Sequence, residues 1–461
     1  MVSQPLDDLK AAAGPGGWSD DPEVLASRLV EWRGRWTGRT PLLLRPRTTA
    51  EVSRVVAVAA RTRTALTVRG GGTGLVGGQA PDGEVLLSLE RMTALREVCA
   101  EGDVLVAEAG ATLDAVQAAA EAADRSFPVG LASGGSATVG GMVATNAGGV
   151  SVLRYGSMRE QVLGLEAVLA DGSVWNGLSR LRKDNTGYDL RGLLIGAEGT
   201  LGVVTAASLR LRPRLADRAV ALAGVASPEA ALALLHRVQA EAAGRLEAFE
   251  LISGAGLGLA LRHLPGSRPP LAAPHPWLVL VEIAAARTGE AQALLEGALA
   301  QGVVVDAALA ASEAQRHALW ALREGQSAAQ KAEGPAWKHD VSVPVAAVPE
   351  FLRRAGEAVE RLSPGARVVA FGHVGDGNIH YDVLAPPGAD PAGHMDKAAE
   401  AMRAVHDVVH ALGGSISAEH GLGVLKTAEA LRYKDPVAVA AMRAIRAALD
   451  PHRILNPRVL F

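Results

Sequence analysis

Residues 69–78 read RGGGTGLVGG, and two more glycine-rich stretches follow, SGGSATVGGMVATNAGG at 133–149 and DNTGYDLRGLLIGAEGTLG at 184–202. Glycine lacks a Cβ and tolerates positive φ, so such runs can turn successive backbone N–H groups toward a phosphate. A glycine-rich turn without a ligand is the commoner outcome for one isolated loop. Because three such stretches occur in one chain, we favour a site for a phosphate-bearing ligand.

A Rossmann dinucleotide site is the first alternative, because Gly72, Gly74 and Gly77 satisfy the spacing G-x-G-x-x-G after a predicted strand. In that motif the last glycine opens a helix. Here residues 78–83, GQAPDG, are typical of a turn that leads to another strand. The match is therefore weak.

Short helices and strands alternate around the glycine-rich stretches. Thr48 and Glu51 stand at capping-box spacing ahead of apolar residues at helical period, which predicts a helix over 48–62. Strands are expected at 65–68, 85–89, 104–110 and 202–213, a helix at 113–123, and a hairpin turning at Asp171-Gly172. This pattern predicts an α+β nucleotide-binding region ending near Pro213.

A second α+β region follows. Strands are expected at 219–225, 277–284 and 303–309, helices from Ser227-Pro228 and over 289–301, 312–332 and 394–412, and a hairpin within 366–384. The pattern favours a small sheet covered by helices.

Composition narrows the class of protein. The chain has 461 residues, 49% hydrophobic and 21% charged, so two or three globular domains are expected. The formal net charge of −3 gives no indication of a nucleic-acid surface. The single cysteine, Cys99, the acidic N-terminal segment and the shortness of the apolar runs predict a cytoplasmic protein without a signal peptide or membrane span.

The three glycine-rich stretches, in this order and spacing, resemble the vanillyl-alcohol oxidase and p-cresol methylhydroxylase flavoprotein superfamily, and most closely its FAD-linked D-2-hydroxyglutarate and D-lactate dehydrogenases. The resemblance implies a two-part FAD-binding domain over 1–215, an α+β substrate (cap) domain with an antiparallel sheet over 216–414, and a C-terminal segment, 415–461, that returns to the FAD domain. Members with covalent FAD often place a histidine in the first stretch, where this chain has Thr73. We therefore expect noncovalent FAD.

The same resemblance implies the flavin-binding residues. The pyrophosphate would lie on the first stretch, the flavin on the second, and the adenine side on the third. The residues are Arg69, Gly70, Gly71, Gly72, Thr73, Gly74, Leu75, Gly77, Gly78, Pro128, Gly130, Ala132, Ser133, Gly134, Ser136, Thr138, Gly140, Gly141, Ala144, Asn146, Glu198, Gly199, Gly202, Val203 and Asn456.

A metal site is predicted by GHVGDGNIH at 372–380. A two-residue turn at Asp376-Gly377 would set His373 directly opposite His380, about 5 Å apart at Cβ and on one face. Simple hydrogen bonding across the hairpin is the alternative. Glu419 in SAEHGLG would complete a two-histidine, one-carboxylate set, which suits zinc best and leaves ferrous iron and manganese open.

The resemblance extends to both motifs and implies that His420, beside Glu419, is the general base. Neighbouring residues on a regular strand point to opposite faces, so the backbone must turn here, as Gly421 and Gly423 would allow. A solvent-exposed Glu-His pair is the alternative.

The family's carboxylate-binding residues fall on Arg323, Ser327 and Lys338, with serine in place of the usual threonine. Arg323 and Ser327, four residues apart on one expected helix, would share a face. A surface arginine is the alternative for Arg323. Asp382, past the second metal histidine, is a further candidate substrate residue.

The resemblance therefore implies FAD-dependent oxidation of a D-2-hydroxy acid, with D-2-hydroxyglutarate as the first choice. The alternatives are a D-lactate or glycolate dehydrogenase or oxidase, and a flavin-binding subunit without turnover. An electron-transfer flavoprotein or a quinone would accept the electrons, and a homodimer is left open.

Overall fold

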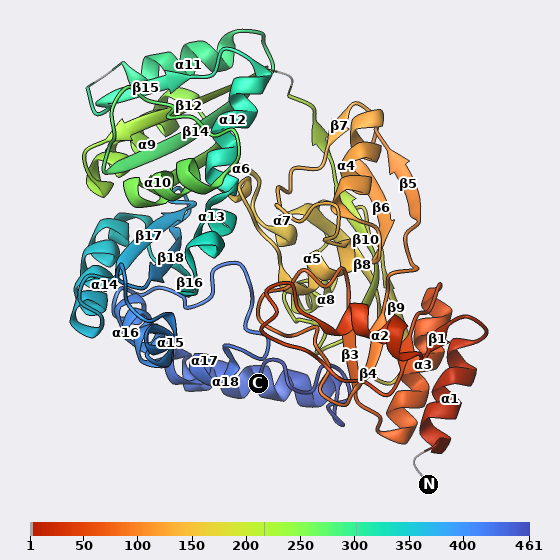
Figure 1. The fold of residues 1–461 in the computed structure, drawn as a ribbon. Helices are drawn as coiled ribbons and strands as arrows, with labels where there is room; N and C mark the ends of the chain where they lie inside the picture. The colour runs from red at the N-terminus through yellow and green to blue at the C-terminus, as the bar shows by residue number, and fades with distance from the viewer. Residues whose placement is uncertain (1–2, 216, 301) are drawn as a thin grey trace. The chain divides into compact units, whose positions relative to one another are not determined.

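The computed structural model describes residues 3–215, 217–300 and 302–461, and it divides into two compact units (Figure 1). Unit 1 comprises Met1–Gly149, Tyr155–Arg214 and Glu419–Phe461, and unit 2 comprises Val150–Arg154 and Leu215–Ala418. The expected domain limits at residues 1 and 216, and the expected helix end at Gln301, lie outside the described residues.

Unit 1 begins with a four-stranded sheet in the order β1-β2-β4-β3, in which β2, β4 and β3 are parallel. Helix α3 packs on this sheet through Val52, Val55, Val56 and Ala59. Thr48 caps it as expected, accepting from Glu51 N at 3.2 Å. The elements are α1 Ser3–Ala13, β1 Trp18–Ser19, α2 Pro22–Leu29, β2 Leu43–Leu44, α3 Thr49–Thr62, β3 Leu66–Arg69 and β4 Val85–Ser88.

The second part of unit 1 is an antiparallel five-stranded sheet in the order β5-β6-β10-β8-β9. The hairpin at Asp171-Gly172 is confirmed, because Val168 pairs with Val174 and Gly172 has a φ of +90°. The elements are β5 Leu95–Cys99, β6 Val104–Glu108, α4 Leu113–Ala122, β7 Arg125–Ser126, α5 Val139–Thr145, α7 Met158–Gln161, β8 Val162–Val168, β9 Val174–Gly177, α8 Leu190–Leu194, β10 Val203–Arg210 and β11 Arg212–Pro213. The short helix α6, Val152–Tyr155, belongs to unit 2 except for Tyr155.

The C-terminal segment returns to unit 1, as expected. Helices α17 (Thr427–Tyr433) and α18 (Pro436–Leu449) lead to residues that pair with β3, where Leu66 N donates to Ile454 O at 2.7 Å and Asn456 N donates to Leu66 O at 2.8 Å. The chain therefore closes on the strand that precedes the first glycine-rich stretch.

Unit 2 is built on one antiparallel seven-stranded sheet in the order β15-β12-β14-β13-β17-β18-β16 (Figure 1). Helices α10 and α12 share a core with β12, β13 and β14, while α9 and α11 pack on each other and on the sheet. The elements are β12 Asp217–Val225, α9 Pro228–Ala242, β13 Leu246–Ser253, α10 Gly254–His263, β14 Trp277–Ala285, α11 Glu290–Leu299, β15 Asp306–Leu309, α12 Glu313–Glu324, α13 Gln326–Glu333, β16 Ala336–Ser342, η1 Val345–Ala347, α14 Val348–Leu362, β17 Arg367–Gly372, β18 Asn378–Leu384, α15 Pro391–Asp396 and α16 Ala398–Ala411.

Unit 2 differs from the expectations in several places. The helix expected over 394–412 is divided into α15 and α16, and β16 and α14 were not expected. The single helix over 312–332 is divided at Gly325, where a Cβ would lie 2.3 Å from Leu264 of the α10 turn, so Arg323 and Ser327 belong to different helices. Strand β13 was not expected, because Glu247 and Glu250 interrupt its apolar pattern. Both glutamates are buried and paired with arginines, which removes the cost of placing them in a central strand.

Candidate functional site

A cavity in unit 1 brings together all three glycine-rich stretches and the C-terminal segment. The expected flavin residues that line it are Gly70, Gly71, Gly72, Thr73, Gly74, Gly78, Thr138, Gly140, Gly141, Ala144, Glu198, Gly199, Gly202 and Asn456. His420 lines the same cavity. Unit 1 therefore contains a cavity lined by glycine-rich backbone that can receive a phosphate-bearing cofactor.

The glycines are required by the close approach of the first two stretches. A Cβ on Gly71 would lie 1.8 Å from Ser136 O, and a Cβ on Gly70 would lie 2.6 Å from Thr138 Oγ1. The Gly71 N–H donates to that same hydroxyl at 3.2 Å. The two loops can form one cradle only because both residues lack side chains.

Other expected flavin residues do not line this cavity. Gly77 lies against the Trp36 ring, and Asn146 caps α5 while its Oδ1 accepts from Ser157 Oγ and Arg159 N, both at 2.9 Å. Val203 is fully buried in the core. The others outside the lining are Arg69, Leu75, Pro128, Gly130, Ala132, Ser133, Gly134 and Ser136.

The cavity also has lining residues that sequence reasoning missed. Most are apolar and lie beside the glycine-rich stretches or at the ends of the strands that lead into them, which is the signal that could have found them. They are Val68, Gln79, Leu89, Ala109, Leu131, Ala137, Ala147, Leu194 and Val204.

Glu198 and Asn456 fix the chain around His420. The Glu198 carboxylate accepts from Leu422 N at 2.9 Å and Gly423 N at 2.8 Å, and its carbonyl accepts from Asn456 Nδ2 at 2.6 Å. Burial raises the pKa of Glu198 against the effect of these two N–H donors. Gly421 and Gly423 have φ of +72° and +50°, so the backbone does turn directly after His420.

The turn that carries His373 differs from the expected two-residue hairpin. Phe371, not His373, pairs with His380, and residues 373–377 form a longer turn. The slip is two residues, which preserves the face of a strand because side chains alternate with period two. The His373 and His380 rings consequently still lie close, with centroids 5.9 Å apart.

Glu250, which sequence reasoning missed, connects His373 to Arg323. Its Oε1 lies 2.6 Å from His373 Nδ1, and its Oε2 accepts from Arg323 Nε at 2.7 Å. Burial alone would raise the pKa of Glu250, but its interactions with His373 and Arg323 outweigh burial and hold it at about 2. Arg323 is only 6% exposed, and its guanidinium lies 4.9 Å from the Phe371 ring centroid, so it is a buried residue and not a surface cation.

Lys338 and Asp382 are brought together on neighbouring strands. Lys338 Nζ donates to Asp382 Oδ2 at 2.8 Å and to Gln330 Oε1 at 2.7 Å. Ser327 is half-buried on α13. Lys338 is therefore already partly neutralised, and the expected carboxylate-binding group consists of two ion-paired cations.

The histidine pair meets a simple test for a metal site. A hydrogen bond from His373 Nδ1–H to a carboxylate puts the ring in the tautomer whose Nε2 carries a lone pair, as in metal-ligating histidines. His380 Nδ1 lies 3.8 Å from Asp340 Oδ1. Ala418 N donates to the carbonyl of Asp340 at 3.3 Å, and Glu419 is the next residue in the chain.

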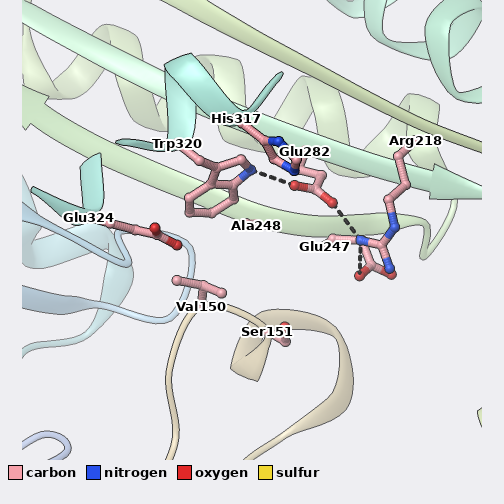
Figure 2. A pocket seen from close by; sticks show the side chains of 9 residues that line it. All are labelled: Val150, Ser151, Arg218, Glu247, Ala248, Glu282, His317, Trp320 and Glu324. Carbon is pink, nitrogen blue, oxygen red and sulfur yellow. Dashed lines mark hydrogen bonds and ion pairs between the residues drawn. The ribbon is translucent and has the colours of Figure 1, made fainter. Parts of the chain in front are cut away.

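A second cavity, of about 400 Å³, lies in unit 2 and is shown in Figure 2. It carries three carboxylates, Glu247, Glu282 and Glu324, with His317, Trp320 and Arg218. Arg218 Nη1 donates to Glu282 at 2.6 Å, and so does Trp320 Nε1. This excess of carboxylates disfavours an anionic substrate.

Comparison with known proteins identifies the class. Residues 40–177 match the FAD binding domain family, and residues 214–460 match the family of FAD linked oxidases, C-terminal domain. The structure of p-cresol methylhydroxylase with substrate bound is similar over 100% of this chain and 97% of that chain, with a TM-score of 0.79 and 14% identity. That of alkyldihydroxyacetonephosphate synthase covers 100% and 85%, with a TM-score of 0.75 and 16% identity. The chain is thus a flavoprotein with this two-domain fold, as the sequence predicted.

Two relatives with higher sequence identity are both named D-2-hydroxyglutarate dehydrogenase. A D-2-hydroxyglutarate dehydrogenase of Xanthomonas citri pv. viticola is 38% identical over 435 residues, covering 94% of this chain and 91% of the relative. The mitochondrial D-2-hydroxyglutarate dehydrogenase of Bos taurus is 40% identical over 461 residues, covering 98% and 82%. The chain belongs to the FAD-linked oxidase family that contains these dehydrogenases. Among the described residues, no helix has the length and apolarity that a membrane crossing needs.

Proposed function

We propose that this chain oxidises D-2-hydroxyglutarate to 2-oxoglutarate with noncovalent FAD and a divalent metal, zinc being the best fit to its ligands. The observation that carries the proposal is that His420 lines the same cavity as the three glycine-rich stretches. A base beside a flavin site is what oxidation of an alcohol requires. The names of the relatives support the choice of substrate.

His420 accepts the proton of the substrate 2-hydroxyl on an imidazole nitrogen. Bound FAD supplies the acceptor for the hydride that leaves C2. His373, His380 and Glu419 would hold the metal, which lowers the pKa of a hydroxyl bound to it. Gly421 and Gly423 turn the backbone after His420, and Glu198 fixes that turn through its two N–H contacts.

Arg323 and Lys338 bind substrate carboxylate. Arg323 uses Nε for Glu250, so its two terminal nitrogens keep the forked geometry that matches a carboxylate. Lys338 gives two of its three ammonium protons to Gln330 and Asp382, which leaves one donor for substrate. Glu250 and Asp382 lower the net charge at this position, so the two cations can be buried before substrate binds.

The decisive experiment compares initial rates of the FAD-loaded protein on D-2-hydroxyglutarate, D-malate, D-lactate and glycolate with an artificial electron acceptor. We expect kcat/KM for D-2-hydroxyglutarate to exceed that for D-lactate by ~10-fold or more, because D-lactate lacks the second carboxylate that could accept charge-assisted hydrogen bonds from Arg323 and Lys338. An equal kcat/KM on D-lactate or glycolate would show that D-2-hydroxyglutarate is not the preferred substrate. Failure of every substrate to bleach the flavin would favour a binding subunit without turnover.

The metal has its own test. Chelation followed by gel filtration should abolish turnover and leave FAD bound, and Zn²⁺ should restore activity. Stoichiometric metal retained in a double His373→Ala, His380→Ala variant would contradict the ligand set.

We propose a cytoplasmic location, because a single free thiol is more stable in a reducing compartment. An electron-transfer flavoprotein or quinone is proposed as acceptor, and stopped-flow reoxidation with each, against oxygen, would distinguish a dehydrogenase from an oxidase.

A further inference from the structure

Glu250 is a buried carboxylate at the point where three elements of unit 2 meet. Its side chain is on β13, next to Leu251, which pairs with Gly372 of β17. Continuing this antiparallel register sets Glu250 directly opposite His373, the first residue after β17. Arg323 reaches the same carboxylate from the last turn of α12. Glu250 is only 1% exposed, so water cannot readily replace His373 and Arg323 as its hydrogen-bond partners.

We propose that Glu250 is a positioning residue that holds a metal-ligand histidine and the substrate-binding arginine with the two oxygens of one carboxylate. The proposal rests on the function proposed above. His373 Nδ1 lies 2.6 Å from Oε1, and Arg323 Nε lies 2.7 Å from Oε2. Each oxygen serves one partner, so metal binding and substrate binding depend on the same side chain.

A carboxylate is required because both of its partners are donors. Glutamine offers one acceptor oxygen and one NH₂ donor. In a Glu250→Gln variant, one partner must face the NH₂ group. If that partner is His373, the ring moves its proton to Nε2 and loses the lone pair that would bind the metal. If it is Arg323, the guanidinium loses its fixed orientation.

The same sheet contains a matched control. Glu282 on β14 is a buried carboxylate that accepts from Arg218 Nη1 and from the ring nitrogen Trp320 Nε1, both at 2.6 Å (Figure 2). Like Glu250 it is on a central strand and bridges an arginine and a ring N–H. Glu282 lies outside the proposed metal and substrate groups. The Glu282→Gln variant therefore measures how the loss of such a bridge affects folding without a direct effect on metal or substrate binding.

The experiment uses FAD-loaded, metal-stripped protein in four forms: wild type, Glu250→Gln, Glu250→Asp and Glu282→Gln. Zn²⁺ affinity is measured by titration against a competing chelator, and KM and kcat for D-2-hydroxyglutarate are measured at saturating Zn²⁺. We expect Glu250→Gln to bind Zn²⁺ ~10–100-fold more weakly. Its KM at saturating Zn²⁺ should remain ~10-fold above the wild-type value, because Arg323 has lost a charge-assisted hydrogen bond. Glu250→Asp, which keeps the charge on a shorter stem, should fall between this variant and wild type.

The inference is overturned if Glu250→Gln matches Glu282→Gln in both Zn²⁺ affinity and KM. If Glu250→Gln does not fold, Glu250→Asp provides the test. A wild-type Zn²⁺ affinity together with a wild-type KM in Glu250→Asp would also overturn the inference. Failure of the proposed function has a different signature, since wild-type protein would then bind no Zn²⁺ or leave D-2-hydroxyglutarate unoxidised.

Discussion

His420 and Glu419 are neighbours in the chain and yet are assigned to one reaction. On a regular strand their side chains would point to opposite faces. The positive φ of Gly421 and Gly423, and the two N–H groups that Glu198 accepts, produce a compact turn at this position. A Cβ on Gly423 would lie 2.3 Å from Val76 O, so the turn also packs tightly against the first glycine-rich stretch.

We predict that His420→Ala lowers kcat by ~100-fold or more and changes substrate affinity little, because a general base acts mainly on the transition state. Single-turnover mixing with D-2-hydroxyglutarate would measure flavin reduction directly. His317→Ala, in the second cavity of unit 2, is the control and should react at the wild-type rate. Unchanged flavin reduction in the His420 variant would remove this residue from the reaction.

At the scale of elements, the turn between β17 and β18 decides where His373 lies. Gly377 has a φ of +85°, and a Cβ there would lie 2.1 Å from Val343 O. The Gly377 carbonyl also accepts from Val343 N at 3.1 Å. The turn is therefore tied to the chain that follows β16.

Gly377→Ala should reduce both stability and Zn²⁺ affinity. Strain from the positive φ costs about 1–2 kcal/mol, and displacement of the turn from Val343 would move His373. Gly388→Ala is the control, because Gly388 has a φ of +78° but no atom within 4 Å of the place that a Cβ would occupy. Thermal unfolding and zinc titration of both variants would separate backbone strain from displacement of the turn. If Gly377→Ala and Gly388→Ala bind Zn²⁺ equally well, the turn does not determine the position of His373.

Glu333 connects three elements and gives a prediction about pH. Its carboxylate accepts from His263 Nε2 at 2.7 Å, Arg367 Nη1 at 2.6 Å and Arg262 Nη1 at 2.6 Å. These hydrogen bonds, that of His263 being the largest, hold its pKa at about 2 against an ordinary 4.5. A lowered folded-state pKa means that the stabilisation is complete above pH 4.5 and is lost as pH falls toward 2.

Glu333→Gln should therefore lower the free energy of unfolding at neutral pH by about 1 kcal/mol, and the difference from wild type should disappear between pH 4.5 and about 2. Urea unfolding across this range would test it. Glu350→Gln, which removes a solvent-exposed pair with Arg353, should change stability less. A difference that persists at pH 2 would rule out the ionised carboxylate as the cause.

At the scale of the whole chain, Arg446 holds the C-terminal return. Its guanidinium donates to the carbonyls of Val459 at 2.6 Å and of Leu455 and Asn456 at 3.0 Å. Burial, followed by the charge of Arg453, lowers its pKa to about 10. Asn456 in turn lines the flavin cavity and accepts from Val68 N at 2.7 Å.

Arg446→Met should destabilise the protein by roughly 2 kcal/mol or more, because buried carbonyls lose their donor, and should weaken FAD binding. The exposed Arg443→Met on the same helix is the control. FAD released during dialysis, followed by its fluorescence, would report the second effect. Wild-type retention of FAD would show that residues 455–459 keep their position without this arginine.

We predict that FAD is bound without a covalent link to the protein. Thr73 occupies the stretch where a tethering histidine would be expected, so acid precipitation should release all of the yellow chromophore as FAD. The release should be equal in wild type and in Thr73→Ser. Colour that stays in the washed pellet would contradict noncovalent binding.

Features that depend on local chemistry could be predicted from the sequence. Thr48 at the start of α3 and the Asp171-Gly172 turn are examples, because caps and turns are encoded by neighbouring residues. The flavoprotein fold, its FAD family and the antiparallel sheet of unit 2 were implied by the resemblance of the three glycine-rich stretches to a known superfamily.

Features that depend on distant partners could be established only from the folded structure. The expected register of β17 and β18 was wrong by two residues, and the observed turn contacts Val343 through Gly377. The helix expected over 312–332 divides at Gly325, which lies against Leu264. β13 was missed because its glutamates look incompatible with a central strand until Arg154 and Arg323 pair with them. Glu250 could not be identified for the same reason: its two partners are 73 and 123 residues away in sequence, and only folding brings their donors to one carboxylate.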